Sequence, residues 1–200
     1  MTHRRGDSFD IRCFRWPAAS RDGVRLATDI YRPAKDGSPL AERLPAIMVR
    51  LPYNKDGQKN VGRYYAARGY VFVAQDTRGR YKSEGVWHML SDDGPDGCDT
   101  AEWVIGQPWS NGRFGMMGTS YFGGTQHAMA MVKAPGLVTV IPVDAMSNLG
   151  YQSMRNAGAF ELRFWNWILL KAHHTILRTL VPVWLATLPG CDRIPLKLVR

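Results

Sequence analysis

Short apolar runs that alternate with helix-forming segments constrain the fold of this chain more than any other feature. The apolar runs are residues 45–51, 70–75, 113–117 and 137–143, and the helix-forming segments between them are residues 61–68, 96–105 and 121–132. Nearly continuous apolar runs of this length are typical of strands that are buried on both faces. Strands that alternate with helices predict an α/β fold with a doubly wound, mostly parallel sheet.

The two ends of the chain depart from this repeat. Residues 9–14 and 24–31 are strand-like and flank an Asp22-Gly23 step, which predicts an antiparallel hairpin. Residues 157–188 are rich in Trp, Leu, Phe and His without a further strand signal, which predicts helices. The expected parts are therefore an α/β domain, residues 1–145, and a helical segment, residues 146–200.

Composition narrows the class of protein. The 26 Lys and Arg residues give a net charge of +9, but they are scattered, which favours a solvated surface over a nucleic-acid site. The three cysteines lie far apart, which argues against a metal site and favours a reducing cytoplasm. Charged residues and Pro182 interrupt the most apolar segment, residues 165–188, so we expect no membrane span. The first seven residues are polar with no apolar run behind them, so we expect no secretory signal. A basic surface binder is retained only as a third alternative.

The strongest chemical signal is a serine at a glycine-rich junction between a strand and a helix. Residues 115–124 read Gly-Met-Met-Gly-Thr-Ser-Tyr-Phe-Gly-Gly, and Ser120 stands where the apolar run passes into the helix. Small neighbours allow a sharp turn that projects the hydroxyl, as in a nucleophile elbow. The generic pattern is Gly-x-Ser-x-Gly, whereas Phe122 takes the place of the second glycine. On these residues alone, a helix-capping role for Ser120 is the alternative.

Five further motifs precede this one in the chain. In order, the six are Arg-Asp-Gly-Val-Arg-Leu-Ala (21–27), Tyr-Arg-Pro (31–33), Pro-Tyr-Asn-Lys (52–55), Gln-Asp-Thr-Arg-Gly (75–79), Ser-Glu-Gly (83–85) and Gly-Thr-Ser-Tyr-Phe-Gly (118–123). The set resembles the bacterial cocaine esterase (CocE/NonD) family, whose relatives are the Xaa-Pro dipeptidyl-peptidases and α-amino-acid ester hydrolases. The resemblance runs from about Val24 to Ala145. It implies an α/β-hydrolase fold, here incomplete, with residues 146–200 as the start of a helical cap.

The resemblance also implies roles for individual residues. Ser120 would attack an ester or amide carbonyl and form an acyl-enzyme. The backbone N–H of Tyr121 and the hydroxyl of Tyr53 would donate hydrogen bonds to the oxyanion. Tyr53 also follows the buried run 45–51, at the end of a strand where ligands bind in open α/β sheets. Packing of a loop is the alternative role for Tyr53.

The base that the serine needs is not evident in the sequence. The family places the acid and the histidine beyond the cap, so we expect both to be missing from these 200 residues. His127 lies about two helical turns after Ser120, which predicts a packed helix residue. His173 and His174 fall within the expected cap helices. Asp144 ends the last apolar run and is the alternative candidate for the acid.

We therefore expect a serine acyl hydrolase that acts on small-molecule esters or amides, needs no cofactor or metal and is truncated. The alternative is an inactive fragment that acts as an interaction module through its cap or an exposed sheet edge. Trp165 and Trp167 either line an acyl pocket or pack between helices. In the loop after residues 70–75, we expect Asp76 to pair with Arg78. The sequence does not predict the oligomeric state.

Overall fold

The computed structural model describes residues 10–146 and 154–167 of the chain. The chain divides into two compact units, Met1–Ser147 and Asn148–Arg200. The elements of the first unit are β1 (Asp10–Ala19), β2 (Arg25–Lys35), β3 (Ser38–Pro39), β4 (Leu44–Leu51), the 3-10 helix η1 (Lys55–Gln58), α1 (Lys59–Ala66), β5 (Val71–Asp76), α2 (Asp93–Gly106), β6 (Ser110–Thr119), α3 (Tyr121–Met131) and β7 (Leu137–Val143). The described part of the second unit contains β8 (Arg155–Asn156), β9 (Ala159–Phe160) and α4 (Leu162–Trp167).

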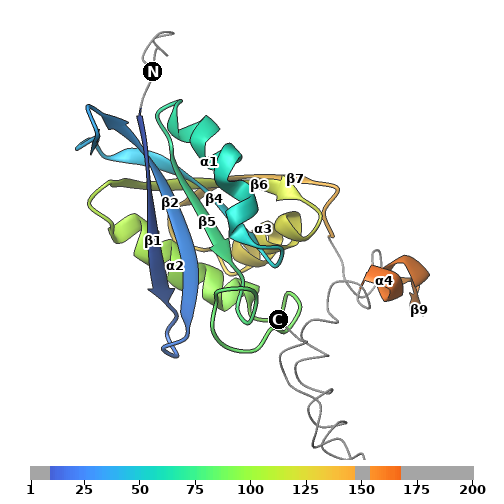
Figure 1. Cartoon of the computed structure of the whole chain (residues 1–200). Coiled ribbons are helices and arrows are strands. Elements are labelled where there is room, and N and C mark those ends of the chain that lie inside the picture. The colour runs from blue at the N-terminus through green and yellow to red at the C-terminus, as the bar shows by residue number, and fades with distance from the viewer. Residues whose placement is uncertain (1–9, 147–153, 168–200) are drawn as a thin grey trace, which may run out of the picture. The chain divides into compact units, whose positions relative to one another are not determined.

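A seven-stranded sheet forms the centre of the first unit (Figure 1). Its strands lie in the order β1-β2-β5-β4-β6-β7, and β3 pairs with β2. The strands from β5 to β7 are parallel, whereas the N-terminal strands are antiparallel, as the hairpin prediction requires. The chain runs from β4 to β5 on one side and then returns to β6 and β7 on the other. This reversal between β4 and β6 confirms the predicted α/β class with a doubly wound sheet.

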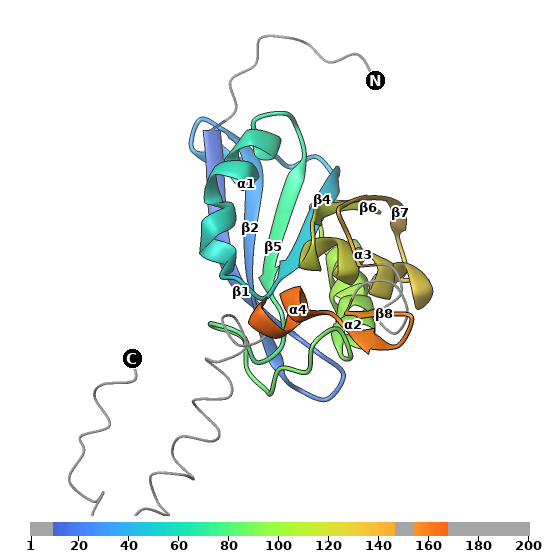
Figure 2. The same ribbon diagram turned by 90° about the vertical axis from the view of Figure 1, so that its right-hand side faces the viewer.

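Helices cover both faces of the sheet, with α1 on one face and α2 and α3 on the other (Figure 2). The side chains of β4 alternate between two buried clusters. Met48 packs in the cluster that includes Val104 of α2 and Met129 of α3, whereas Val49 packs in the cluster that includes Ala66 of α1. Because both faces of β4 are covered, its sequence is an almost continuous apolar run.

The second unit differs from the helical segment that the sequence predicts. Its first described elements are the short antiparallel strands β8 and β9, and the described helix α4 begins only at Leu162. Ala157 and Gly158 have φ values of 48° and 90°, which suit the two central residues of a tight hairpin turn. The sequence analysis missed this turn because the aromatic and leucine content of the segment dominated the pattern. Residues 168–188 of the expected helices lie outside the described residues.

Candidate active site

Ser120 occupies the single-residue junction between β6 and α3. Its backbone has φ 59° and ψ −119°, a region that non-glycine residues adopt only when the surrounding structure holds them there. Its N–H donates to the Val143 carbonyl (2.9 Å), and its carbonyl accepts from the N–H of Gly123 (2.9 Å). The side chain is exposed and makes no capping hydrogen bond to the described helix α3. The geometry therefore fits a nucleophile elbow better than a helix-capping serine.

Two glycines allow the chain to pass so close to itself at this junction. Gly118 has φ 141°, and a Cβ atom there would lie 2.5 Å from the Cβ of Phe122. A Cβ atom on Gly123 would lie 2.3 Å from the Cβ of Ala145. Such separations are far below carbon–carbon contact distance, so glycine is required at both positions. The absence of side chains at these two positions therefore allows the sharp turn from β6 into α3 at Ser120.

Tyr53 lies at the same edge of the sheet. β4 and β6 are parallel neighbours, so Tyr53, two residues after β4, and Ser120, directly after β6, both follow carboxyl ends of adjacent strands. The Tyr53 ring stacks on Phe122 with the centroids 5.9 Å apart and meets the Tyr121 ring edge-on at 6.2 Å. The structure thus brings Tyr53 against the two residues that follow Ser120. This edge is also the reversal point of the strand order, where open α/β sheets bind ligands.

The loop that carries Tyr53 is held by the last residue of β5 and by the loop that follows this strand. Arg80 Nε donates to the Pro52 carbonyl (3.1 Å), and the Lys55 N–H donates to the Asp76 carboxylate (2.7 Å). Asp76 is fully buried, and burial raises the pKa of its carboxyl to about 6. The residues on both sides of Tyr53 are therefore fixed by contacts from the end of β5 and the loop after it.

The expected pairing of Asp76 with Arg78 is wrong. Arg78 instead forms ion pairs with Asp96 of α2 (2.6 Å) and with Asp22 of the β1–β2 turn (2.7 Å). These bonds hold the pKa of the Arg78 guanidinium above its ordinary value. The buried Asp76 carboxylate instead accepts the Lys55 N–H. Asp76 and Arg78 are therefore each bonded to residues that are distant in sequence.

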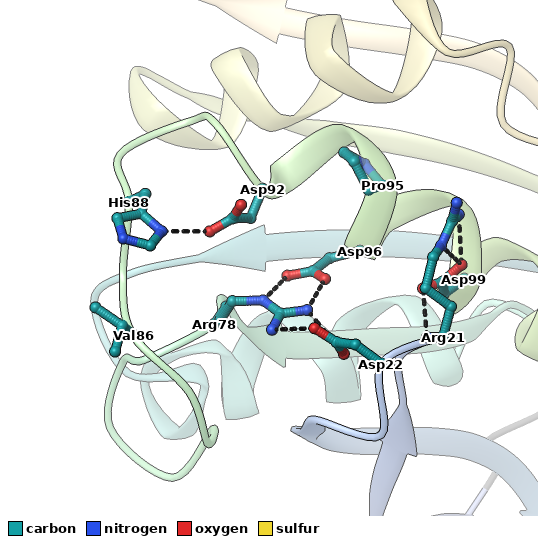
Figure 3. Close-up of a pocket in the computed structure, with 9 residues that line it drawn as sticks. All are labelled: Arg21, Asp22, Arg78, Val86, His88, Asp92, Pro95, Asp96 and Asp99. Atoms are coloured by element: carbon teal, nitrogen blue, oxygen red, sulfur yellow. Dashed lines mark hydrogen bonds and ion pairs between the residues drawn. The ribbon is translucent and has the colours of Figure 1, made fainter.

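Arg78 lines a pocket of about 400 Å³ whose two arginines are both paired with aspartates (Figure 3). The ion pairs are Arg21 with Asp99 (2.7 Å) and Arg78 with Asp96 and Asp22, and Nδ1 of His88 is hydrogen-bonded to the Asp92 carboxylate (2.9 Å). Neither Ser120 nor Tyr53 is among its lining residues. The pocket is a junction that ties the β1–β2 turn to helix α2, and it is separate from the nucleophile elbow.

The Tyr121 side chain enters a buried polar network behind the elbow. Its hydroxyl donates to the Asp93 carboxylate (2.8 Å) and accepts from Trp87 Nε1 (3.1 Å) and the Leu90 N–H (3.0 Å). Burial raises the pKa of the Tyr121 hydroxyl. Burial also raises the pKa of the Asp93 carboxyl, although the positive charge of Arg50, 3.3 Å away, partly offsets this rise. Sequence reasoning missed Asp93, because an aspartate in the first turn of a helix is an ordinary feature.

The described histidines lie elsewhere. Nδ1 of His127 bonds to the Met146 carbonyl (2.9 Å), in agreement with the packed role expected for it, and His88 belongs to the charged pocket. Among the described residues, neither histidine is hydrogen-bonded to Ser120, and His173 and His174 lie outside them.

Two further predicted groups have defined places within their own units. Asp144 is exposed and directly follows β7, one residue beyond the carbonyl that accepts the Ser120 N–H. In the second unit, Trp165 packs edge-on against Phe160 with the centroids 6.1 Å apart, and Trp167 lies 6.2 Å from Phe164. These contacts favour aromatic packing of the two tryptophans within their unit.

An exposed serine with positive φ between a parallel strand and a helix, on a doubly wound sheet, defines an α/β-hydrolase. Residues 22–180 match the model of the X-Pro dipeptidyl-peptidase (S15) family. The chain therefore belongs to this family of serine hydrolases.

Individual relatives confirm the resemblance to CocE/NonD hydrolases. Cocaine esterase of Rhodococcus sp. (strain MB1 Bresler) is 40% identical over 135 residues, which are 64% of this chain and 23% of that protein. A CocE/NonD family hydrolase from Staphylococcus aureus has a TM-score of 0.68 at 26% identity, over 78% of this chain and 32% of its own. An α-amino acid ester hydrolase has a TM-score of 0.67 at 28% identity, over 82% of this chain and 30% of its own. The chain thus spans 23% of the length of the cocaine esterase.

Within residues 10–146 and 154–167, no helix is long and apolar enough to cross a membrane. The same described ranges contain no group of three or more His, Cys, Asp or Glu side chains placed to hold a metal ion.

Proposed function

We propose that the chain supplies the nucleophile and the oxyanion site of an acyl hydrolase for small-molecule esters or amides. The observation that carries this proposal is the exposed Ser120 with φ 59° at the junction of β6 and α3. Its Oγ would form a bond to the substrate carbonyl carbon while a base takes the hydroxyl proton. The alcohol or amine would then leave with a proton, and water would hydrolyse the acyl-enzyme. A cytoplasmic location and independence of cofactors remain predictions.

The proposed oxyanion donors are the Tyr121 N–H and the Tyr53 hydroxyl. Tyr121 is the first residue of helix α3. The first N–H groups of a helix have no partner within the helix, so they can donate hydrogen bonds to an anion such as the oxyanion. The ring contacts of Tyr53 with Tyr121 and Phe122 support a place for its hydroxyl beside the nucleophile. Loss of one such donor typically slows acyl transfer by about a hundredfold to a thousandfold.

The reaction also needs a base and a carboxylate that orients it. Because neither His88 nor His127 bonds to Ser120, we propose that the imidazole comes from outside residues 10–146. Asp144 is retained as a candidate acid because it adjoins the elbow. In a full-length relative, an Asp144→Asn equivalent that left hydrolysis unchanged would assign the acid to another element.

A second candidate function is binding without catalysis. Strand β7, at the edge of the sheet that the described residues form, exposes Val138 (61%), Ile141 (59%) and Val143 (51%). Exposed apolar edges are typical of strands that recruit a partner. In this alternative, Ser120 would be unreactive and the sheet edge would carry the function.

Hydrolysis of p-nitrophenyl acetate by the purified chain separates the two candidates, with the Ser120→Ala variant beside it and circular dichroism to verify folding. Turnover that depends on Ser120 supports the acyl hydrolase and shows that a base is available. If the two folded proteins have equal rates, labelling with a fluorophosphonate decides between the candidates: an adduct on Ser120 means that only the base is missing, and no adduct favours the binding function.

A further inference from the structure

We infer that Asp93 is a positioning residue for the nucleophile elbow, acting through the hydroxyl of Tyr121. Tyr121 is the residue after the nucleophile, and the proposed function uses its backbone N–H as an oxyanion donor. The inference rests on that proposed function, because it assigns a purpose to the side chain of the same residue. Three observations support it. All hydrogen-bonding positions of the Tyr121 hydroxyl are occupied, the Asp93 carboxylate is held by buried Arg50, and Arg50 lies on the chain segment that leads to Tyr53.

The bonding capacity of the Tyr121 hydroxyl is completely used. A phenol has one O–H donor and two acceptor positions. Trp87 Nε1 and the Leu90 N–H can only donate, and they fill both acceptor positions at 3.1 and 3.0 Å. The single O–H proton must therefore point at Asp93 Oδ2, which lies 2.8 Å away. Three bonds in fixed directions leave the ring of this fully buried residue one position.

Asp93 is itself held by the rigid sheet. Nη1 of Arg50, on β4, donates to the Asp93 carbonyl (2.6 Å) and lies 3.3 Å from its carboxylate. Arg50 Nε donates to Gln75 of β5 (2.7 Å), and the Arg50 side chain is fully buried. The network thus links the first turn of α2 to two central strands before it reaches Tyr121.

Arg50 also connects the two proposed oxyanion donors. It lies three residues before Tyr53 on the same chain segment, and its carbonyl accepts a bond from the Thr125 hydroxyl of α3 (3.3 Å). The position of the Tyr121 amide relative to Tyr53 is therefore set through β4 as well as through the ring contact between them (6.2 Å). A displacement of about 1 Å at a reacting group can slow a reaction by about a hundredfold.

The test compares the full chain with three variants. Tyr121→Phe removes the hydroxyl, Asp93→Asn keeps an oxygen that can accept its bond, and Asp99→Asn makes the same change farther along α2, where the partner is the exposed Arg21. We measure the rate constant for acylation of Ser120 at saturating p-nitrophenyl acetate. Tyr121→Phe is expected to lower it by about tenfold to a hundredfold, Asp93→Asn less, and Asp99→Asn not at all. The ester concentration for half-saturation stays unchanged, whereas loss of folded protein alone would lower the amplitude of the reaction.

Two results would overturn the inference. One is a Tyr121→Phe protein that acylates at the Asp99→Asn rate. The other is measured by backbone hydrogen exchange at residues 121–124, which needs no catalysis and therefore decides even if the wild-type chain does not acylate. Faster exchange there in Tyr121→Phe than in Asp99→Asn supports the positioning role, and equal exchange refutes it. If Tyr121→Phe does not fold, the same comparisons are made with Asp93→Asn.

Discussion

Replacement of Asp76 by asparagine isolates a buried carboxyl that fixes the Tyr53 loop. The carboxylate accepts the Lys55 N–H at 2.7 Å, and the amide oxygen of asparagine can accept the same bond. The change therefore removes the ionisation of the side chain while it keeps the shape and the main hydrogen bond. Asparagine resembles the protonated aspartic acid at every pH.

The expected magnitude follows from the pKa of Asp76. Burial raises this pKa from 3.8 to about 6. Between these pH values the folded protein retains a proton that the unfolded chain has lost, so the free energy of unfolding falls as the pH rises. A pKa difference of about two is worth about 3 kcal/mol, since each pH unit corresponds to about 1.4 kcal/mol. The contribution is complete below pH 4 and is lost above pH 6.

Urea unfolding of both proteins from pH 4 to pH 7 measures this effect. The difference in free energy of unfolding between Asp76→Asn and the wild type should shift by about 3 kcal/mol in favour of the variant over that range. The hydrogen bond from Lys55 lowers the pKa of Asp56 to about 2, so Asp56 acts below this window. A difference that stays constant from pH 4 to pH 7 would refute the reasoning.

Three further substitutions test the elbow and its supports. Tyr53→Phe should slow Ser120-dependent ester hydrolysis by about a hundredfold while the melting temperature stays within a few degrees, and an unchanged rate would return Tyr53 to a packing role. Gly123→Ala should lower the free energy of unfolding by about 1–3 kcal/mol or more because its Cβ would lie 2.3 Å from that of Ala145, whereas Gly57→Ala, with open space around it, is the control for urea unfolding. Arg50→Met should cost about 3–5 kcal/mol in the same assay because it leaves the buried Asp93 without its cation, whereas Asp96 keeps its ion pair with Arg78, and a loss below 1 kcal/mol would contradict the buried ion pair.

The fold and the elbow were predictable from local patterns. The apolar runs at β4 and β5 are near-continuous because both of their faces are buried, and this is visible in the sequence. Ser120 and its glycines mark a strand-to-helix junction whose steric requirement limits the residues allowed there. Tyr53 follows from its place just after β4 together with the family resemblance.

The supports of the site were not predictable, because they depend on pairs that are distant in sequence. Arg78 bonds to Asp22, which is 56 residues away, and to Asp96, so the neighbouring Asp76 was the wrong partner to expect. Tyr121 and Asp93 are 28 residues apart and meet only because α2 packs beside α3. No local pattern distinguishes such an aspartate from one that caps a helix.

Covalent labelling of the intact chain with a fluorophosphonate tests most directly whether Ser120 is the nucleophile. The wild-type protein is treated at pH 8, and the modified residue is located by peptide mass spectrometry, with Ser120→Ala and the exposed-loop variant Ser91→Ala beside it. A single adduct on Ser120, absent from Ser120→Ala and retained in Ser91→Ala, is the expected result. A folded wild-type protein with no adduct, or with its adduct on another residue, would contradict the assignment of the elbow serine as a nucleophile.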